Sequence, residues 1–210
     1  MRKYKGGYIG YADLHVHSIH SPDGTAAISA ILKYTADFTH LDIIAITDHD
    51  TMDGVAEAMD LAPQYKLEVI PGCEISSAEG HVLALFIDRP VQAGLSLLET
   101  VLRVGEQGGL CVAAHPRAKG TSSLSFESIE KVLTHPKAAQ ILVGIEAFNG
   151  GLVYTRSNQV VQEASSRMQL AQVGNSDAHI LPMLGVGSSF FIGNTAQDLR
   201  CALENRCTIP

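Results

Sequence analysis

Asp13-Leu-His-Val-His17 is the stretch of sequence around which the rest of the chain is arranged. Side chains two residues apart on a β-strand point to the same face, so His15 and His17 project together at the end of a strand predicted over residues 12–16. Two imidazoles on one strand face, beside a carboxylate in the following loop, suit a divalent metal ion. A pair of surface histidines at a strand end is the alternative, and the remaining strands decide between the two.

Apolar runs of strand length, about seven in all, alternate along the chain with amphipathic segments of helical length. Examples are strands predicted over residues 41–47 and 110–114 and helices predicted over residues 95–106 and 153–168. This alternation is typical of parallel βα units, and near-continuous apolar runs are typical of strands buried on both faces. We predict a closed or nearly closed α/β barrel with the site at the carboxyl ends of the strands; a doubly wound open sheet is the alternative.

The composition indicates one domain rather than two. The chain has 210 residues, of which 46% are hydrophobic and 18% charged, enough for one sizeable core. No apolar run reaches the roughly 18–20 residues of a membrane helix, and the basic start is not followed by the apolar core of a signal sequence. None of the four cysteines, Cys73, Cys111, Cys201 and Cys207, belongs to a Cys-x-x-Cys pair. We expect buried or incidental thiols, a cytoplasmic protein and no membrane partner.

The formal net charge is −7, whereas a broad nucleic-acid-binding face is normally basic. Long nucleic acid is therefore disfavoured as a partner, although bound divalent cations would offset several negative charges locally. The chain contains no Trp, and so it shows little sign of an aromatic platform on which single-stranded bases stack. The sequence leaves the oligomeric state open.

Histidines and acids gather at the ends of the predicted strands. The strand-end histidines are His15, His17, His49, His115 and His179, while His81 opens a strand and His20 lies in the loop after the first one. The strand-end acids are Asp48, Asp50, Glu74, Glu146 and Asp177. His40 and His135 follow helices instead, and we expect both to be structural or exposed to solvent.

Such a cluster of acids is unfavourable without cations, because carboxylates held together repel and desolvate one another. Imidazole is mostly neutral at neutral pH, so the histidines alone would not offset the negative charge. Metal ions resolve this, and a bridging carboxylate suits two ions about 3.5–4 Å apart. Each short motif alone is weak, but His-x-His, Asp-His-Asp, Gly-x-Glu, His-Pro and Asp-x-His, each at a strand end, jointly indicate a metal centre.

Five motifs closely resemble those of the polymerase and histidinol phosphatase (PHP) domain, a family of metal-dependent phosphoesterases. They are Asp13-Leu-His-Val-His17, Ile46-Thr-Asp-His-Asp50, Pro71-Gly-Cys-Glu74, Ala114-His-Pro116 and Ser176-Asp-Ala-His179, and the resemblance extends over about residues 11–192. It implies a single PHP-like domain over residues 1–210, folded as a distorted seven-stranded (β/α) barrel. It also implies two or three divalent metal ions as cofactors, with zinc, manganese or iron as the candidates.

The resemblance implies three groups of metal ligands. The first is His15, His17, Glu74 and Asp177, the second shares Glu74 and adds His81 and His115, and the third is Asp23, His49 and His179. Some members of the family carry a histidine where Asp23 stands here, which leaves two ions as the alternative to three.

Three further residues have predicted roles. Arg117 directly follows His115-Pro116, and its guanidinium would match a phosphate group bidentately; a surface arginine is the alternative. Asp48 is expected to orient a metal-bound histidine by accepting a hydrogen bond from it. His20 is expected to be a bystander; the alternatives are that it supports a metal ligand or binds the substrate.

Together these features predict a metal-dependent phosphoesterase that acts on a small phosphorylated substrate, either a phosphomonoester or a nucleotide. Glu74 would hold two ions whose bridging hydroxide attacks phosphorus, and Arg117 would stabilise the transferred group. His179 or Asp48 would assist proton transfer to the leaving group. The segment between residues 90 and 110 has room for one helix and no cap domain, which favours a small substrate.

Three alternatives stay open. The first is a phosphodiesterase or exonuclease that acts on short oligonucleotides. The second is a metal-dependent amidohydrolase, although such barrels usually carry a later-strand lysine and no predicted strand here ends in Lys. The third is a metal-binding module without catalytic activity.

Overall fold

The fold, taken from a computed structural model, is described for residues 2–4, 7–118, 122–151 and 156–210. The strands are β1 (Arg2–Tyr4), β2 (Gly7–Val16), β3 (Ile43–Ile46), β4 (Glu68–Ser77), β5 (Gly80–Leu85), β6 (Leu110–Ala113), β7 (Leu142–Asn149), β8 (Ala171–Asn175) and β9 (Ser189–Ile192). The helices are α1 (Ile28–Phe38), α2 (Val55–Leu61), α3 (Leu97–Glu106), α4 (Phe126–Leu133), α5 (Ala138–Ile141), α6 (Arg156–Met168) and α7 (Ala196–Glu204), with short 3₁₀ helices at Ala62–Tyr65 and Leu181–Met183. Residues 153–155 of the helix predicted over 153–168 lie outside the described part.

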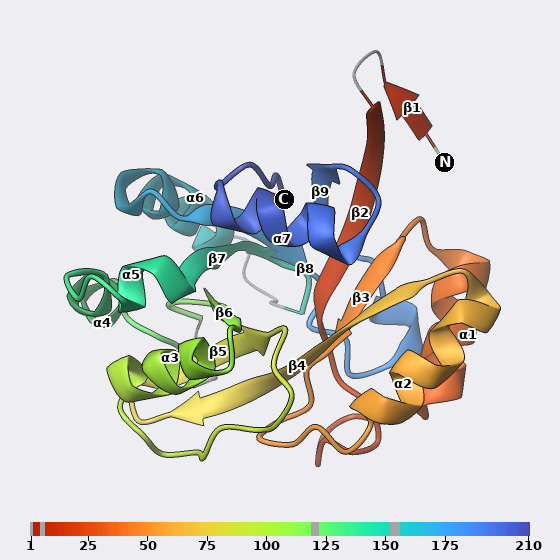
Figure 1. The fold of residues 1–210 in the computed structure, drawn as a ribbon, viewed down its shortest axis with the longest axis horizontal. Coiled ribbons are helices and arrows are strands. Elements are labelled where there is room, and N and C mark those ends of the chain that lie inside the picture. The colour runs from red at the N-terminus through yellow and green to blue at the C-terminus, as the bar shows by residue number, and fades with distance from the viewer. Residues whose placement is uncertain (1, 5–6, 119–121, 152–155) are drawn as a thin grey trace.

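The strands form one sheet in the order β1 to β8, with β9 added beside β2, and helices flank it (Figure 1). The sheet nearly closes on itself, because the ends of β2 and β8 meet around residue 178. The His17 N–H donates to the carbonyl of Ala178 at 3.0 Å, and the Ala178 N–H donates to the carbonyl of His15 at 3.3 Å. The predicted barrel is therefore confirmed. The path from β1 to β8 holds one strand more than the seven predicted, because the sequence did not indicate β1.

The prediction of parallel βα units is wrong at β9, which runs antiparallel to β2, and at β5. Strands β2, β3 and β4 are parallel, as are β6, β7 and β8, but β5 runs antiparallel to both of its neighbours. Only Ala78 and Glu79 separate β4 from β5. A parallel connection needs about a dozen residues or more, so this link can only form a hairpin. The reversal matters for the site, because it brings the start of β5 to the end of the barrel where its neighbours finish.

One apolar cluster fills the inside of the barrel, and α7 closes its far end. Residues from nearly every strand contribute, including Leu14, Ile43, Leu85, Val112, Val143 and Val173, and Leu199 and Leu203 of α7 pack against them without exposure. Burying a leucine side chain fully contributes about 1.5–3 kcal/mol. A capping box starts α7: the Thr195 hydroxyl accepts from the Asp198 N–H, and the Asp198 carboxylate accepts from the Thr195 N–H, each at 3.1 Å.

Two outer clusters lie between the sheet and its helices, one beneath α1 and α2 and one beneath α3 to α6. The helix predicted to enter through Ser125 does so, since its hydroxyl accepts from the Ser128 N–H at 3.0 Å. Cys73 and Cys111 are buried, whereas Cys201 and Cys207 are exposed. Among the residues described, every helix is too short or too polar to cross a membrane.

Candidate metal centre

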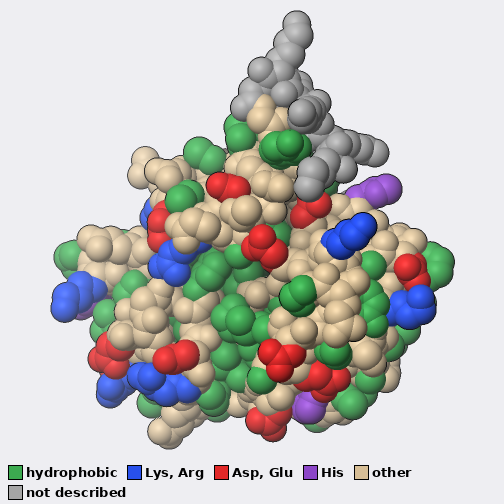
Figure 2. All heavy atoms as spheres, turned by 45° about the vertical axis from the view of Figure 1, so that its right-hand side comes forward, with side chains coloured by type: hydrophobic (Ala, Val, Ile, Leu, Met, Phe, Trp, Pro, Cys, Tyr) green, Lys and Arg blue, Asp and Glu red, His purple; other side chains and the backbone are tan. Residues whose placement is uncertain are grey.

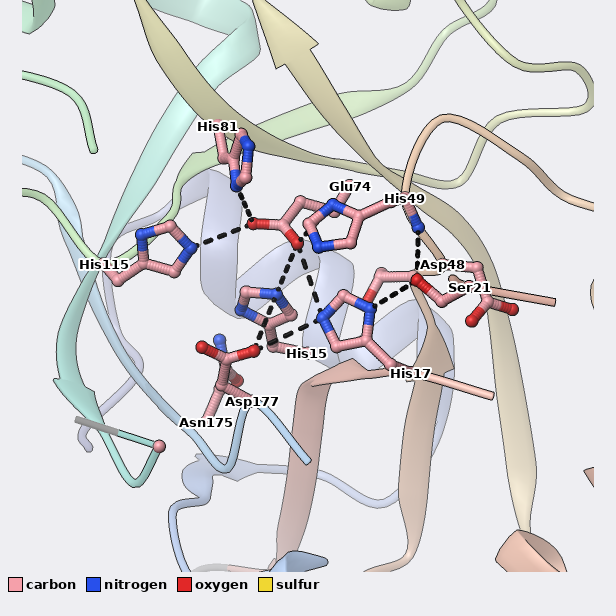
Figure 3. Close-up of polar contacts among 12 residues, drawn as sticks. His15, His17, Ser21, Asp48, His49, Glu74, His81, His115, Asn175 and Asp177 are labelled. Carbon is pink, nitrogen blue, oxygen red and sulfur yellow. Dashed lines mark hydrogen bonds and ion pairs between the residues drawn. The ribbon is translucent and has the colours of Figure 1, made fainter. Parts of the chain in front are cut away.

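All the predicted ligands converge at one end of the barrel. Figure 3 shows those around Glu74 pointing toward one another: His15, His17, His49, His81, His115 and Asp177. His15 and His17 come from the end of β2, Glu74 from the later part of β4, and His49, His115, Asp177 and His179 from the segments after β3, β6 and β8. Parallel strands bring their carboxyl ends to the same edge of a sheet, which explains most of this set. His81 arrives differently, because it is the second residue of the reversed strand β5.

Glu74 lies at the centre of the cluster, and its carboxylate is shared by five imidazoles. Oε1 lies 3.0 Å from a nitrogen of His81 and 3.0 Å from a nitrogen of His115. Oε2 lies 3.1, 3.2 and 3.4 Å from nitrogens of His15, His49 and His17. The residue is only 1% exposed. Each oxygen of Glu74 thus faces its own set of histidines, which is the arrangement expected of a carboxylate that bridges two cations.

Two aspartates complete the cluster on either side. Asp177 Oδ1 lies 3.4 Å from His15 Nε2 and 3.3 Å from His17 Nε2. Asp23 Oδ2 lies 3.1 Å from His179 Nε2 and 3.4 Å from His49 Nε2. Asp23 and His179 are more exposed than the other ligands, so this third group lies at the mouth of the site.

The chemistry of these donors fits divalent cations. Three buried nitrogens, His15 Nε2, His17 Nε2 and His81 Nδ1, have no hydrogen-bond partner although each faces a carboxylate. Leaving a buried polar group unpaired costs about 1–3 kcal/mol, so an unpaired set aimed at shared carboxylates requires an explanation. The candidate ligands form four groups, and within each group the ligand atoms lie within 4.8 Å of one another. The groups are His17, Asp23, His49 and His179; His15, His17 and Asp177; His15, Glu74 and His115; and His49, Glu74 and His81.

The histidines and carboxylates of the cluster stabilise each other's charged forms. Burial lowers the pKa of His15, but the carboxylates of Asp177, Glu74 and Glu146 outweigh burial and hold that pKa well above its usual value. Burial raises the pKa of Glu74, yet the charge of His15 and the hydrogen bond from His115 bring it well below its usual value. The pKa of Asp177 is lowered too, since the charge of His15 overcomes the effect of burial. The carboxylates thus stay ionised, which is the form that binds a cation.

A second layer of polar groups supports the ligands, and the sequence did not reveal most of it. The Ser21 hydroxyl lies 3.3 Å from His17 Nδ1 and accepts from the His49 N–H at 3.1 Å, so it positions two ligands at once (Figure 3). Buried Asp13 accepts from the N–H groups of Ser176 and Gly185, at 3.0 and 3.2 Å, and burial raises its pKa to about 6. A serine in the turn after His-x-His was the available signal for Ser21.

Several loops at this end hold strained backbone. Asp50, His115, Arg117 and Asp177 all have positive φ, between 27° and 60°, although none is glycine. Such conformations cost of order 1–3 kcal/mol each and cluster at functional sites. Two of these residues, His115 and Asp177, are candidate ligands, so their strained backbone lowers the stability of the fold while it orients their side chains toward the centre.

Asp48 was predicted to accept a hydrogen bond from a metal-bound histidine, but its partner is Ser18. Its carboxylate accepts from the N–H of Ser18 at 2.6 Å and from the Ser18 hydroxyl at 2.7 Å, and no histidine in the described chain is among its hydrogen-bond donors. It therefore holds the loop after β2 rather than orienting a ligand. His40 is exposed and His135 accepts from the Ala138 N–H at the start of α5, so both lie outside the metal centre, as predicted.

Arg117 and His20 come from the loops that carry the ligands, but their side chains form no hydrogen bond or ion pair with a ligand in the described structure. The Arg117 guanidinium lies over the ring of Phe126, 5.5 Å from its centroid, on an exposed side chain two residues after His115. His20 is exposed, and its ring packs against Gly54, where an added Cβ would come within 2.7 Å. Both remain candidates for contact with a substrate.

Family models match most of the chain. Residues 13–170 match the model described as the PHP domain, and residues 155–208 match one described as PHP-associated. An uncharacterized protein of Methanocaldococcus jannaschii is 34% identical over 167 residues, which cover 72% of this chain and 92% of that protein. A 5'-3' exoribonuclease of Haemophilus influenzae is 28% identical over 196 residues, covering 91% of this chain and 63% of the enzyme.

A solved structure shares the fold. It is a two-domain protein of Bacteroides vulgatus described as containing a predicted PHP-like metal-dependent phosphoesterase. The match has a TM-score of 0.75 and 22% identity, and it covers 97% of this chain and 65% of the other.

Proposed function

The chain belongs to the PHP domain family, and on this premise we propose that it is a metal-dependent phosphoesterase acting on a small phosphorylated substrate. The observation that carries the proposal is the Glu74 carboxylate, whose two oxygens face five imidazoles from the ends of separate strands. A single carboxylate between so many nitrogen donors suits a centre of more than one ion. Phosphate ester hydrolysis is the chemistry for which such centres are commonly used.

Divalent cations, when bound, supply an activated water and offset the charge that builds up on phosphoryl oxygens. The residues present divide the remaining work. Glu74, with His15, His17, His81, His115 and Asp177, would hold the inner ions, and Asp23, His49 and His179 would hold a third at the mouth. Zinc, manganese and iron all accept this mixture of imidazole and carboxylate donors.

Substrate contacts would come from the rim. Arg117 lies on the loop after His115, and its exposed guanidinium lies over the aromatic ring of Phe126; among the described residues no ion pair holds it there, so it could turn toward a phosphate. His179 is 30% exposed at the mouth, where its ring would meet a leaving group and could pass a proton to it. Asp48 is too enclosed by Ser18 for the same task, which favours His179.

A small substrate is favoured over long nucleic acid. The net charge of −7 opposes a polyanion at a distance. On the face drawn in Figure 2, basic side chains are interspersed with acidic ones rather than gathered in one stripe. The exoribonuclease name of one relative supports the second candidate, a phosphodiesterase or exonuclease on short oligonucleotides.

The test is a comparison of esters on one metal-loaded preparation. Protein stripped of metal and reloaded with manganese or zinc is assayed on p-nitrophenyl phosphate, bis(p-nitrophenyl) phosphate and a short oligonucleotide. Faster release from the monoester supports the proposal, and faster release from either diester favours the second candidate. If the protein binds metal but hydrolyses none of the three esters, the result favours the third alternative, a metal-binding module without catalytic activity.

Glu74→Gln should abolish turnover with little change in the circular dichroism spectrum, because the amide cannot bridge cations. Glu68→Gln is the matched control: it makes the same change on the same strand, at an exposed carboxylate that accepts the Ala196 N–H. Full activity in Glu74→Gln would remove the proposed role of this residue.

A further inference from the structure

One buried carboxylate beneath the ligands has no role in the function proposed above. Glu146 lies near the end of β7 with a fully buried side chain. It touches no substrate-accessible surface, and it belongs to none of the four candidate ligand groups. Its two oxygens face only groups that can donate a hydrogen bond, which is the environment of an ionised carboxylate.

Four donors saturate this carboxylate. Oε1 lies 2.8 Å from His15 Nδ1 and accepts from Asn175 Nδ2 at 2.7 Å. Oε2 accepts from the His115 backbone N–H at 2.6 Å and from Asn149 Nδ2 at 3.0 Å. The donors come from β2, β7, β8 and the segment after β6, so one side chain joins four parts of the barrel end.

The contact with His15 determines which ring nitrogen carries the proton. An ionised carboxylate can only accept, so neutral His15 must carry its proton on Nδ1. Its Nε2 then keeps a lone pair, and that atom is the unpaired nitrogen 3.1 Å from Glu74 and 3.4 Å from Asp177. The opposite tautomer would place an N–H in the metal centre and leave His15 unable to act as a ligand.

The contact with His115 holds a strained backbone. His115 has a φ of 27°, in a region that residues other than glycine rarely adopt. Glu146 Oε2 anchors its N–H, while the ring points Nε2 at Glu74 Oε1, 3.0 Å away. The same oxygen binds Asn149, whose amide also donates to Asp177 Oδ2 at 3.2 Å. Glu146 therefore reaches three candidate ligands, His15 and His115 directly and Asp177 through Asn149, without belonging to any of the four candidate ligand groups.

We propose that Glu146 is a positioning residue of the metal centre, which fixes the tautomer of His15 and the backbone of His115 so that both rings present Nε2 to Glu74. This inference rests on the metal-binding part of the proposed function and is independent of hydrolysis. Partners of this kind typically change metal affinity about 10- to 100-fold when they are removed.

The decisive variant is Glu146→Gln. A glutamine has one amide oxygen and one NH₂ group, but all four neighbours of Glu146 are donors. If the NH₂ group of the introduced glutamine faces His15, the ring must accept on Nδ1 and move its proton to Nε2. In the opposite orientation the NH₂ group faces the His115 N–H, and two donors then oppose each other. The control is Asn175→Ala, which removes a neutral donor from the same oxygen, together with the acceptor of the Leu14 N–H, and leaves the Glu146 carboxylate facing His15.

Two measurements test the inference on the full chain. Zinc affinity, measured in competition with a chromophoric chelator, should weaken about 10- to 100-fold in Glu146→Gln and much less in Asn175→Ala. Long-range ¹H–¹⁵N spectra of the zinc-loaded wild-type protein should show His15 protonated on Nδ1, a readout that requires no variant to fold.

The outcomes separate this inference from the proposed function. Unchanged zinc affinity in Glu146→Gln, equal losses in the two variants, or a wild-type His15 protonated on Nε2 would each overturn the role of Glu146 and leave the metal centre standing. Failure of the wild-type protein to bind zinc, manganese or iron would overturn both. Absence of ester hydrolysis in protein with the expected zinc and NMR results would overturn the phosphoesterase alone.

Discussion

Removal of divalent ions should lower the thermal stability of the protein by several degrees for each ion lost. The metal-free centre holds three buried imidazole nitrogens without a hydrogen-bond partner, which makes the folded state less favourable than it is with cations bound. An ion at one hundred times its dissociation constant adds about 2.7 kcal/mol to the free energy of unfolding. For a chain of this size each kcal/mol shifts Tm by about 2–4 °C, so one filled site should raise Tm by about 5–11 °C.

The assay is a thermal melt of protein treated with a chelator, dialysed, and titrated with zinc or manganese. Tm should rise with metal concentration, and a second rise at higher concentration would reveal a weaker group, which we expect to be the more exposed one at Asp23 and His179. His81→Ala should reduce the shift, because it removes a ligand from the group that also contains His49 and Glu74.

Glu74→Gln distinguishes the centre from adventitious binding. This variant loses the carboxylate that two of the four ligand groups share, so most of its metal-dependent shift should disappear. Glu68→Gln should keep the full shift. If chelation leaves the wild-type Tm unchanged, or if Glu74→Gln responds to metal as the wild-type protein does, the reasoning from unpaired nitrogens is refuted.

Three further predictions concern protons, the barrel interior and the rim. Burial lowers the pKa of His15, but the surrounding carboxylates raise it above its usual value in the metal-free protein, which favours the protonated ring; a proton on Nε2 must leave when this atom becomes a ligand. Zinc binding should therefore release protons and tighten as pH rises, which calorimetry in buffers of different ionisation enthalpy will measure, and a proton count of zero at pH 7 would contradict this. Leu199→Ala opens a cavity in the barrel interior and should cost about 2–5 kcal/mol in urea unfolding without changing zinc affinity; a loss under 1 kcal/mol would contradict close packing of α7. Arg117→Ala should lower kcat/KM for a phosphate ester and leave the metal-dependent Tm shift intact, with partial recovery in Arg117→Lys, whereas equal kinetics would assign this arginine to the surface.

The barrel and most of the ligand set were predictable because both depend on short-range patterns. His15 and His17 share a strand face, and the other ligands follow apolar runs whose ends must meet if the strands are parallel. His81 was the least regular case, because it opens a strand instead of ending one. The two-residue link before β5 explains it, since a hairpin reverses the strand and brings its first residues to the ligand end.

The parts that the sequence did not reveal depend on pairings across the barrel. Asp48 follows the pattern of a ligand, being next to His49 after a strand, yet its carboxylate binds Ser18 at a distance of 30 residues in sequence. No spacing rule distinguishes these two neighbours, because the turn after β3 decides which one faces Glu74. Helix α5 was also missed, since its four residues, Ala138–Ile141, are too few to produce a periodic pattern.

Glu146 gives the clearest reason for this limit. As an acid at a strand end it looked like any other member of the cluster, and its function follows only from contacts with groups 131 and 31 residues away in sequence. β7 and β2 are not neighbours in the sheet, so even the correct strand order would not pair Glu146 with His15. The pairing requires the sheet to close, because only then do the ends of β2 and β8 meet around residue 178 and bring β7 within reach of β2. Closure of the barrel therefore decides that Glu74 lies among the candidate ligands, whereas Glu146 lies beneath them and binds His15 and His115.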